Sequence, residues 1–107
     1  MGKIFEKVYH FVKRVPKGKV VTYGQVSEQI ESCTPRIVGY AMAAVEDSDI
    51  PWQRVINSKG EVSPRAWGEA QITQQEILVE EGVMFNKNGK VDLKKFRFIF
   101  SELECQT

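Results

Sequence analysis

A chain of 107 residues is long enough for one domain with a modest core, and its hydrophobic (42%) and charged (27%) fractions are ordinary for a soluble globular protein. Apolar runs stay far below the roughly 20 residues that cross a bilayer, and the first residues lack the apolar segment of a secretory signal. We therefore expect a single domain over residues 1–107, without a membrane segment, in the cytoplasm.

The cysteine spacing and the charge distribution do not identify a binding partner. Cys33 and Cys105 lack the spacing of metal ligands, so we expect two free thiols, no metal and no cofactor. The net charge is only +1, but basic residues gather near both ends of the chain, within 3–19 and 87–97, and acidic residues gather at 46–49 and 76–81. This separation is equally compatible with a basic nucleic-acid face and with solvated helix surfaces.

The first half of the chain predicts three helices around one short extended piece. Apolar residues at helical spacing over 3–15 predict an amphipathic helix that ends at Pro16, and residues 20–21 follow as the extended piece. Thr22 and Gln25 form a capping box for a second helix to about Ile30. Thr34, followed by proline, begins a third helix over about 35–47.

The third predicted helix has two different faces. The apolar stripe is predicted to face the core and comprises Ile37, Val38, Ala41, Met42 and Val45. The opposite face comprises Arg36, Gly39, Tyr40 and Ala43. Two helices joined by a tight turn, with small residues on the exposed face of the second, predict a helix-turn-helix over about 23–47.

The second half predicts a small sheet and two helices. A strand over 54–57, a turn at 58–60 and a helix over 70–81 that ends at Gly82 are expected in that order. Asn88 and Gly89 predict a hairpin. Asp92 is expected to cap a last helix with inward apolar side chains at Leu93, Phe96, Ile99 and Phe100. The predicted fold is mainly α-helical with a small β-sheet or hairpin.

Four sequence blocks, in the same order and at compatible spacing, resemble the DNA-binding domain of the O6-alkylguanine-DNA alkyltransferases over about residues 3–98. Residues 15–24 match Pro-x-Gly-x-Val-x-Thr-Tyr-Gly, and 35–41 resemble Ala-Arg-Ala-Val-Gly. Residues 51–55 match Pro-Cys-His-Arg-Val at three of five positions, and 78–82 match Leu-x-x-Glu-Gly. The resemblance implies the winged-helix-like helix-turn-helix fold of that family's C-terminal domain.

The third block has lost the residues that carry the family's chemistry. In the alkyltransferases the cysteine takes the alkyl group from guanine and the histidine activates it. Trp52 and Gln53 occupy these positions here. An indole is not a nucleophile toward an alkyl carbon, and a primary amide does not accept a thiol proton at neutral pH. The chain therefore resembles the alkyltransferase-like proteins, which bind alkylated guanine without repairing it, and we expect no catalytic residue.

The resemblance assigns nucleotide flipping to two residues. Tyr23 would push the phosphate of the target nucleotide, and Arg36 would fill the space that the base leaves. Taken alone, Tyr23 is better explained as a packed aromatic residue and Arg36 as a surface charge. However, a cation at a helix N-terminus is disfavoured by the helix dipole, which favours an ionic or stacking role for Arg36.

Small residues on the exposed helix face also fit DNA. The family places this helix in the minor groove, and Gly39 and Ala43 would allow close approach, although close helix packing explains Gly39 equally well. Tyr40 is larger than this arrangement favours and is expected at its edge. Thr22 and Gln25, beside Tyr23, are included among the expected DNA contacts.

The expected alkylguanine pocket comprises Pro51, Trp52, Tyr23, Arg65 and Trp67. Trp52 would form a wall of the pocket, although a core aromatic residue beside a proline is the simpler interpretation. Arg65 would stack on the base or lie exposed in its loop, and Trp67 lies where the family has a lid tyrosine. The loop over 63–68 departs from the Gly-rich lid of the family. Arg54 and Glu81 are expected to be structural.

The resemblance implies a non-enzymatic sensor of O6-alkylguanine in duplex DNA, which flags lesions for nucleotide excision repair proteins. We expect a monomer that is nucleoid-associated in a bacterium or nuclear in a eukaryote. A transcription regulator that uses the helix-turn-helix without lesion specificity is the alternative. An enzyme that accepts the alkyl group on Cys33 or Cys105 is a third hypothesis, in which the helix N-terminus beside Cys33 lowers the pKa of its thiol.

Overall fold

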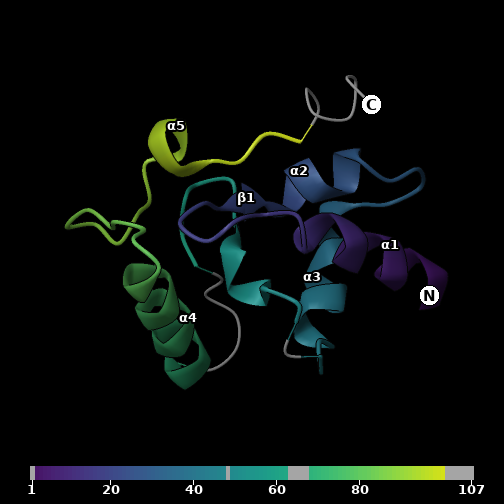
Figure 1. Ribbon diagram of the computed structural model, residues 1–107, viewed down its shortest axis with the longest axis horizontal. Helices are drawn as coiled ribbons and strands as arrows, with labels where there is room; N and C mark the ends of the chain where they lie inside the picture. Colours follow the sequence, from purple (N-terminus) through teal and green to yellow (C-terminus); the bar gives the residue numbers. More distant parts are fainter. Residues whose placement is uncertain (1, 48, 63–67, 101–107) are drawn as a thin grey trace.

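The computed structural model describes residues 2–47, 49–62 and 68–100. In chain order its elements are α1 (Gly2–Val12), β1 (Val21–Thr22), α2 (Tyr23–Glu28), α3 (Pro35–Ala43), the 3₁₀ helix η1 (Trp52–Arg54), β2 (Val55–Ile56), α4 (Gly68–Glu80) and α5 (Leu93–Phe96). Helices α1, α2 and α3 pack together on one side of the sheet, and α4 lies on the other (Figure 1). None of the helices in these ranges is long and apolar enough to cross a membrane.

Helix α1 buries the predicted apolar stripe but is shorter than predicted. Val8 and Val12 are fully buried, and Val15 is buried although it lies beyond the helix. After Val12 the chain tightens into turns, in which the amide of Val15 donates to the carbonyl of Val12 at 3.1 Å. Pro16 disfavours helical geometry in the residue before it, so the helix ends ahead of it.

Helices α2 and α3 begin at the predicted caps. The amide of Gln25 donates to Oγ1 of Thr22 at 3.1 Å and the amide of Thr22 donates to Oε1 of Gln25 at 3.0 Å, which confirms the capping box. The amide of Ile37 donates to Oγ1 of Thr34 at 3.2 Å, and Pro35 is the first residue of α3. Both starts therefore follow from local sequence.

Both helices end earlier than predicted, and the difference is larger for α3. This helix ends at Ala43 instead of residue 47. Beyond it, Oδ1 of Asp47 accepts the amide of Asp49 at 2.8 Å in a local turn. Carboxylates at a helix C-terminus also oppose the helix dipole, so the acidic residues at 46 and 47 favour this turn over further helix.

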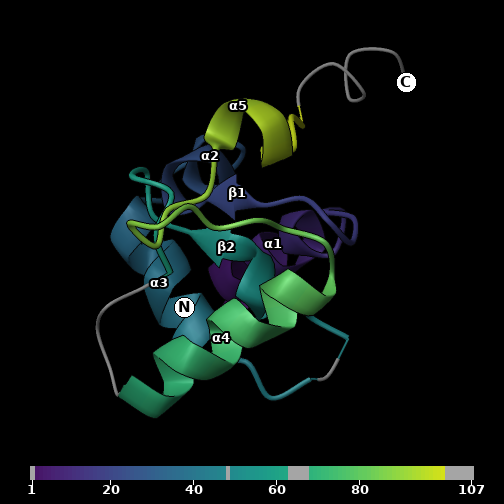
Figure 2. The same ribbon diagram turned by 90° about the vertical axis from the view of Figure 1, so that its left-hand side faces the viewer.

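The small sheet lies between two hydrophobic cores. Strands β1 and β2 pair in parallel, with Val21 opposite Val55 and Thr22 opposite Ile56. Val21 and Val55 face the core formed with α1, α2 and α3, while Val20 and Ile56 face the core beneath α4. Successive side chains of a strand point to opposite faces, so these four residues connect the two cores. Figure 2 shows β1 and β2 at the centre of the molecule.

Helix α4 ends as predicted. Gly82 has a φ of 101°, and its amide donates to the carbonyl of Val79 at 3.0 Å. The amide of Val83 donates to the carbonyl of Leu78 at 3.0 Å. These two bonds define a Schellman motif with glycine in the left-handed conformation.

The predicted hairpin after α4 is present, but its turn is held by the side chain of Asn86 and not by that of Asn88. Phe85 pairs with Val91 in an antiparallel bridge. Oδ1 of Asn86 accepts the amides of Asn88 at 2.8 Å and Lys90 at 3.1 Å. The side chain of Asn86 therefore organises the turn. Gly89 lies in this turn, as predicted, and has a positive φ of 78°.

The last predicted helix is present as a single turn, α5. The prediction that Ile99 points inward was wrong. Asp92 caps the helix through the amide of Lys94 at 3.0 Å, and Phe96 and Phe100 are buried. Beyond Phe96 the chain is extended beside β1, with the amide of Phe98 donating to the carbonyl of Val20 at 2.8 Å. Alternation in an extended chain turns Ile99 outward, where it is 47% exposed.

Candidate nucleic-acid interface and pocket

The pentapeptide at 51–55 forms a tight turn that leads into the sheet. The amide of Trp52 donates to the carbonyl of Ile50 at 2.8 Å, and that of Arg54 donates to the carbonyl of Pro51 at 3.0 Å. Val55 then joins β2. The predicted strand over 54–57 is thus shorter, because the 3₁₀ turn includes Arg54.

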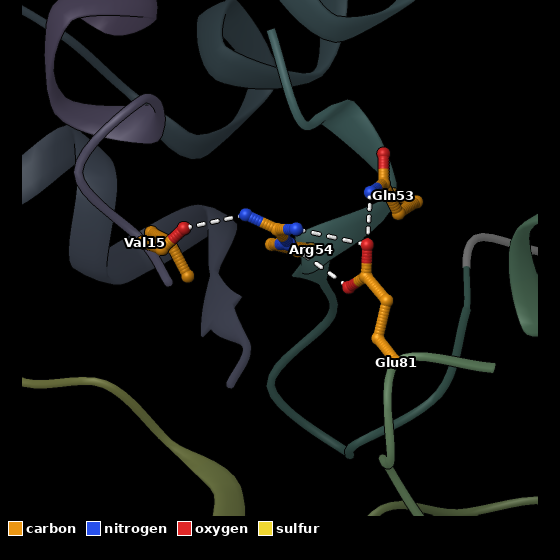
Figure 3. Close-up of polar contacts among 4 residues, drawn as sticks. All are labelled: Val15, Gln53, Arg54 and Glu81. Atoms are coloured by element: carbon orange, nitrogen blue, oxygen red, sulfur yellow. Dashed lines mark hydrogen bonds and ion pairs between the residues drawn. The ribbon is translucent and has the colours of Figure 1, made fainter. Parts of the chain in front are cut away.

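Arg54 and Glu81 form a two-point ion pair beneath this turn (Figure 3). Nε of Arg54 donates to Oε1 of Glu81, and Nη2 donates to Oε2, both at 2.9 Å. Nη1 of Arg54 donates to the carbonyl of Val15 at 2.8 Å. The two side chains are only 16% and 10% exposed. Through these bonds the pair connects the turn after α1, the pentapeptide and the residue that follows α4. The predicted structural role of both residues has a geometric basis.

Gln53 belongs to the same network. Its Nε2 donates to Oε2 of Glu81 at 2.8 Å. Partial burial by itself raises the pKa of Glu81, but the hydrogen bonds from Arg54 and Gln53 and the charges of Arg54 and Lys17 outweigh it, so the pKa lies below its ordinary value. A charged carboxylate only accepts hydrogen bonds, which fixes the amide nitrogen of Gln53 toward it. The amide of Gln53 does not accept a thiol proton.

The sequence analysis missed Gln74, which holds the backbone of the turn. Its Nε2 donates to the carbonyls of Gln53 and Val55, each at 3.1 Å, and the residue is only 5% exposed. Gln74 lies one helical turn before Leu78, which is fully buried. The four-residue spacing from Leu78 was the available signal, although glutamine at such a position is otherwise typical of a helix surface.

Pro51 and Trp52 line a cavity of about 480 Å³ together with the two residues that follow them. Trp52 is half-buried and packs against the first core, as the simpler interpretation predicted. Its role as a wall of the alkylguanine pocket stays a prediction. Three carboxylates, Glu46, Asp47 and Asp49, also line the cavity and outnumber the one lysine there, Lys13, so this side is acidic. Carboxylates repel phosphate, so this side favours an uncharged group over the DNA backbone.

Of the other expected pocket residues, Tyr23 is not part of the lining of this cavity, and Arg65 and Trp67 lie outside the described residues. Tyr23, the first residue of α2, is half-buried and packs against the first core. It does not appear among the described residues that line the cavity. Arg65 and Trp67 lie outside the described residues. The pocket role of these three residues stays a prediction.

Thr22 and Gln25 use their side chains within the fold. Thr22 is 6% exposed and Gln25 donates through Nε2 to the carbonyl of Phe98 at 2.8 Å, in addition to the capping box. The polar groups of Gln25 therefore join α2 to the extended C-terminal segment. A direct DNA contact by either residue stays a prediction. What the structure shows is that the two side chains fix the start of α2.

The outward face of α3 carries the residues predicted for it. Arg36, Tyr40 and Ala43 are exposed and Gly39 is half-buried, while Val38, Ala41 and Met42 on the other side are buried. Within the described ranges, the guanidinium of Arg36 makes no hydrogen bond or ion pair. A cation without a partner on a face of small residues is available to bind a ligand.

The expected lowering of the Cys33 thiol pKa was wrong. Burial raises the pKa of Cys33, and its contact with the carbonyl of Thr34 at 3.7 Å does not compensate. The thiol is free and half-buried, and in its protonated form it is a poor nucleophile. Cys105 lies outside the described residues.

Comparisons with known proteins agree with this geometry. The family model "6-O-methylguanine DNA methyltransferase, DNA binding domain" matches residues 3–83. The chain is 39% identical to alkyltransferase-like protein 1 of Schizosaccharomyces pombe over 85 residues, covering 78% of this chain and 79% of that protein. It is 33% identical to the DNA base-flipping protein of Escherichia coli over 95 residues, covering 87% and 72%.

A solved structure confirms the predicted fold. S. pombe Atl1 in complex with damaged DNA containing O6-carboxymethylguanine superposes with a TM-score of 0.79 at 34% identity. The match covers 92% of this chain and 96% of the S. pombe chain. The helix-turn-helix and the small sheet are therefore arranged as in a protein that has been solved with damaged DNA.

Proposed function

The chain belongs to the family of the 6-O-methylguanine DNA methyltransferase DNA-binding domain, and on that basis we propose that it is a sensor of O6-alkylguanine in duplex DNA. It binds the minor groove through α3, rotates the damaged nucleotide out of the duplex and holds the base at the Trp52 turn. Extruding a base costs a few kcal/mol, which stacking and backbone contacts offset.

The outward face of α3 carries this proposal. Arg36 is unpaired within the described part of the chain and lies on the first turn of the helix, beside small residues at Gly39 and Ala43. A guanidinium there is able to enter the stack and occupy the space of an extruded base. The names of the S. pombe and E. coli relatives, alkyltransferase-like and base-flipping, support the same activity.

We also propose that the protein transfers no alkyl group. Trp52 supplies no thiolate to attack the alkyl carbon, and at the position of the activating base the amide of Gln53 donates to Glu81 at 2.8 Å. Without a covalent product, the output is a long-lived complex on the lesion. Hand-over of that complex to nucleotide excision repair proteins, and action as a monomer, are parts of this proposal.

Paired duplexes that differ only in O6-methylguanine against guanine test the function. Affinity is measured by fluorescence anisotropy of labelled DNA at one stated salt concentration, because phosphate contacts make affinity salt-dependent. We expect clearly tighter binding to the lesion duplex. Equal affinity for both duplexes contradicts lesion sensing and favours the helix-turn-helix regulator.

Mass spectrometry of the protein after the same incubation tests the absence of transfer. We expect an unchanged mass after prolonged exposure to the lesion duplex. A stoichiometric methyl adduct on the chain contradicts a purely non-covalent sensor. Mapping the adduct to Cys33 or Cys105 then identifies the acceptor.

A further inference from the structure

Tyr40 is the bulky residue on the outward face of α3, and from its position we infer that it selects the base pair that flanks the lesion. We propose that Tyr40 makes the protein prefer an A·T pair over a G·C pair about two steps from the damaged base, on one side only. This inference rests on the proposed function, because it takes α3 to enter the minor groove.

The side chain of Tyr40 is free to make such a contact. It is 48% exposed, among the most exposed large hydrophobic side chains of the described residues. Its phenol hydroxyl has no hydrogen-bond partner within the described ranges. Tyr9 differs, because its hydroxyl donates to the carbonyl of Ala41 at 2.9 Å on the inner side of α3. The Tyr40 hydroxyl therefore keeps its hydrogen-bonding capacity for a ligand.

Helical geometry places Tyr40 beside Arg36 along the groove. Residues four apart lie on the same face and are separated by a rise of about 6 Å. Stacked base pairs are about 3.4 Å apart. If Arg36 occupies the space of the extruded base, Tyr40 lies about two base-pair steps away, on the side toward which the C-terminal end of α3 points.

The minor groove presents different groups at that step. An A·T pair shows only acceptors, N3 and O2, while a G·C pair adds the N2 amino group of guanine. The phenol hydroxyl both donates and accepts, so hydrogen bonding alone does not separate the two pairs. At G·C the amino group occupies the floor of a groove only about 6 Å wide, where the ring of Tyr40 has to lie. Steric fit on the groove floor therefore favours A·T.

A duplex series isolates this contact. O6-methylguanine duplexes carry A·T, G·C or inosine·C at each of the three positions on either side of the lesion. Inosine lacks the N2 amino group, so inosine·C resembles A·T in the minor groove and G·C in the major groove. We expect about fivefold tighter binding with A·T or inosine·C than with G·C, at the low end of the cost of one disfavoured base pair, at positions on one side only.

Variants assign the preference to Tyr40. In Tyr40→Ala the flanking preference is expected to vanish while the lesion preference remains. Tyr40→Phe keeps the ring and is expected to keep most of the preference, because the ring supplies the steric fit. Val79→Ala is the matched control, since Val79 is also exposed but lies on α4, and it is expected to behave as the wild type. Circular dichroism checks that each variant is folded.

Three results overturn the inference: no flanking preference in the wild type, an unchanged preference in Tyr40→Ala, or inosine·C behaving like G·C. Failure of the proposed function looks different. In that case wild-type affinity is equal with and without the lesion. A Tyr40-dependent preference for A·T measured on undamaged duplexes still supports the inference in that event, and its absence there contradicts it.

Discussion

Nε2 of Gln53 lies 2.8 Å from Oε2 of Glu81. In the resembling alkyltransferases the matching acid orients the histidine that activates the cysteine. The acid is therefore present here, at the end of α4 and charged through its contacts with Arg54, while the base that it would orient is absent. The carboxylate instead stabilises the turn that carries Trp52.

Restoring transfer should require two changes together. Trp52→Cys alone is expected to give no measurable methyl transfer, because Gln53 does not accept the thiol proton. Trp52→Cys with Gln53→His adds the base beside the existing acid, and general-base assistance contributes about 10²–10⁴-fold in rate. Mass spectrometry after incubation with an O6-methylguanine duplex measures the adduct. Equal transfer by the single and double variants would show that Gln53 is not what limits the chemistry.

Arg36→Ala is expected to weaken binding to lesion DNA more than binding to undamaged DNA. Filling the vacated stack is needed only when a base is extruded, and the loss should be about 1–3 kcal/mol for the lesion duplex. Anisotropy titrations of both duplexes measure it. Arg14→Ala is a control at a second arginine, outside the helix-turn-helix. An equal loss on both duplexes in Arg36→Ala would indicate that Arg36 only contacts phosphate.

The parts of the fold that follow from neighbouring residues were predictable. The capping box of Thr22 and Gln25 and the stop at Gly82 depend on residues within five positions of each other. Gln74 and Ile99 were missed because their environments depend on distant segments: Gln74 meets β2, and Ile99 belongs to a chain held extended by β1. The residues of the Arg54 network were predictable from the family pattern, but its link to Val15 was not.

Gln74→Ala should destabilise the protein by about 1–3 kcal/mol. The change leaves the carbonyls of Gln53 and Val55 without their donor in a buried environment. Urea unfolding monitored by tryptophan fluorescence measures the free energy of unfolding. Gln75→Ala, on the adjacent and less buried residue, should have a small effect. Similar losses in both variants would argue that α4 is sensitive to any alanine at this point.

Gly60→Ala should destabilise the fold more than Gly89→Ala. Both glycines have positive φ, 84° and 78°. A Cβ at Gly60 would lie 2.6 Å from the carbonyl oxygen of Val91, whereas one at Gly89 meets nothing within 4 Å. Backbone strain alone costs about 1–3 kcal/mol, and the clash adds to it at Gly60 only. Thermal unfolding of the two variants gives the comparison, and equal shifts would remove the close approach as a cause.

The stability supplied by Glu81 should depend on pH. Its pKa is lowered in the folded protein, so the stabilisation is present above the unfolded value of about 4.3 and is lost as the pH falls through the folded value. At pH 7, Glu81→Gln should therefore lower the free energy of unfolding by about 2–4 kcal/mol, because it leaves Arg54 without its counter-charge. The difference from wild type should begin to shrink below about pH 4.3, where the carboxylate of the unfolded chain takes up a proton, and should be lost below the lower folded pKa. Urea unfolding at a series of pH values measures both, with Glu80→Gln at an exposed neighbouring position as the control. A difference that stays constant down to pH 2 would show that the charge of Glu81 is not the stabilising feature.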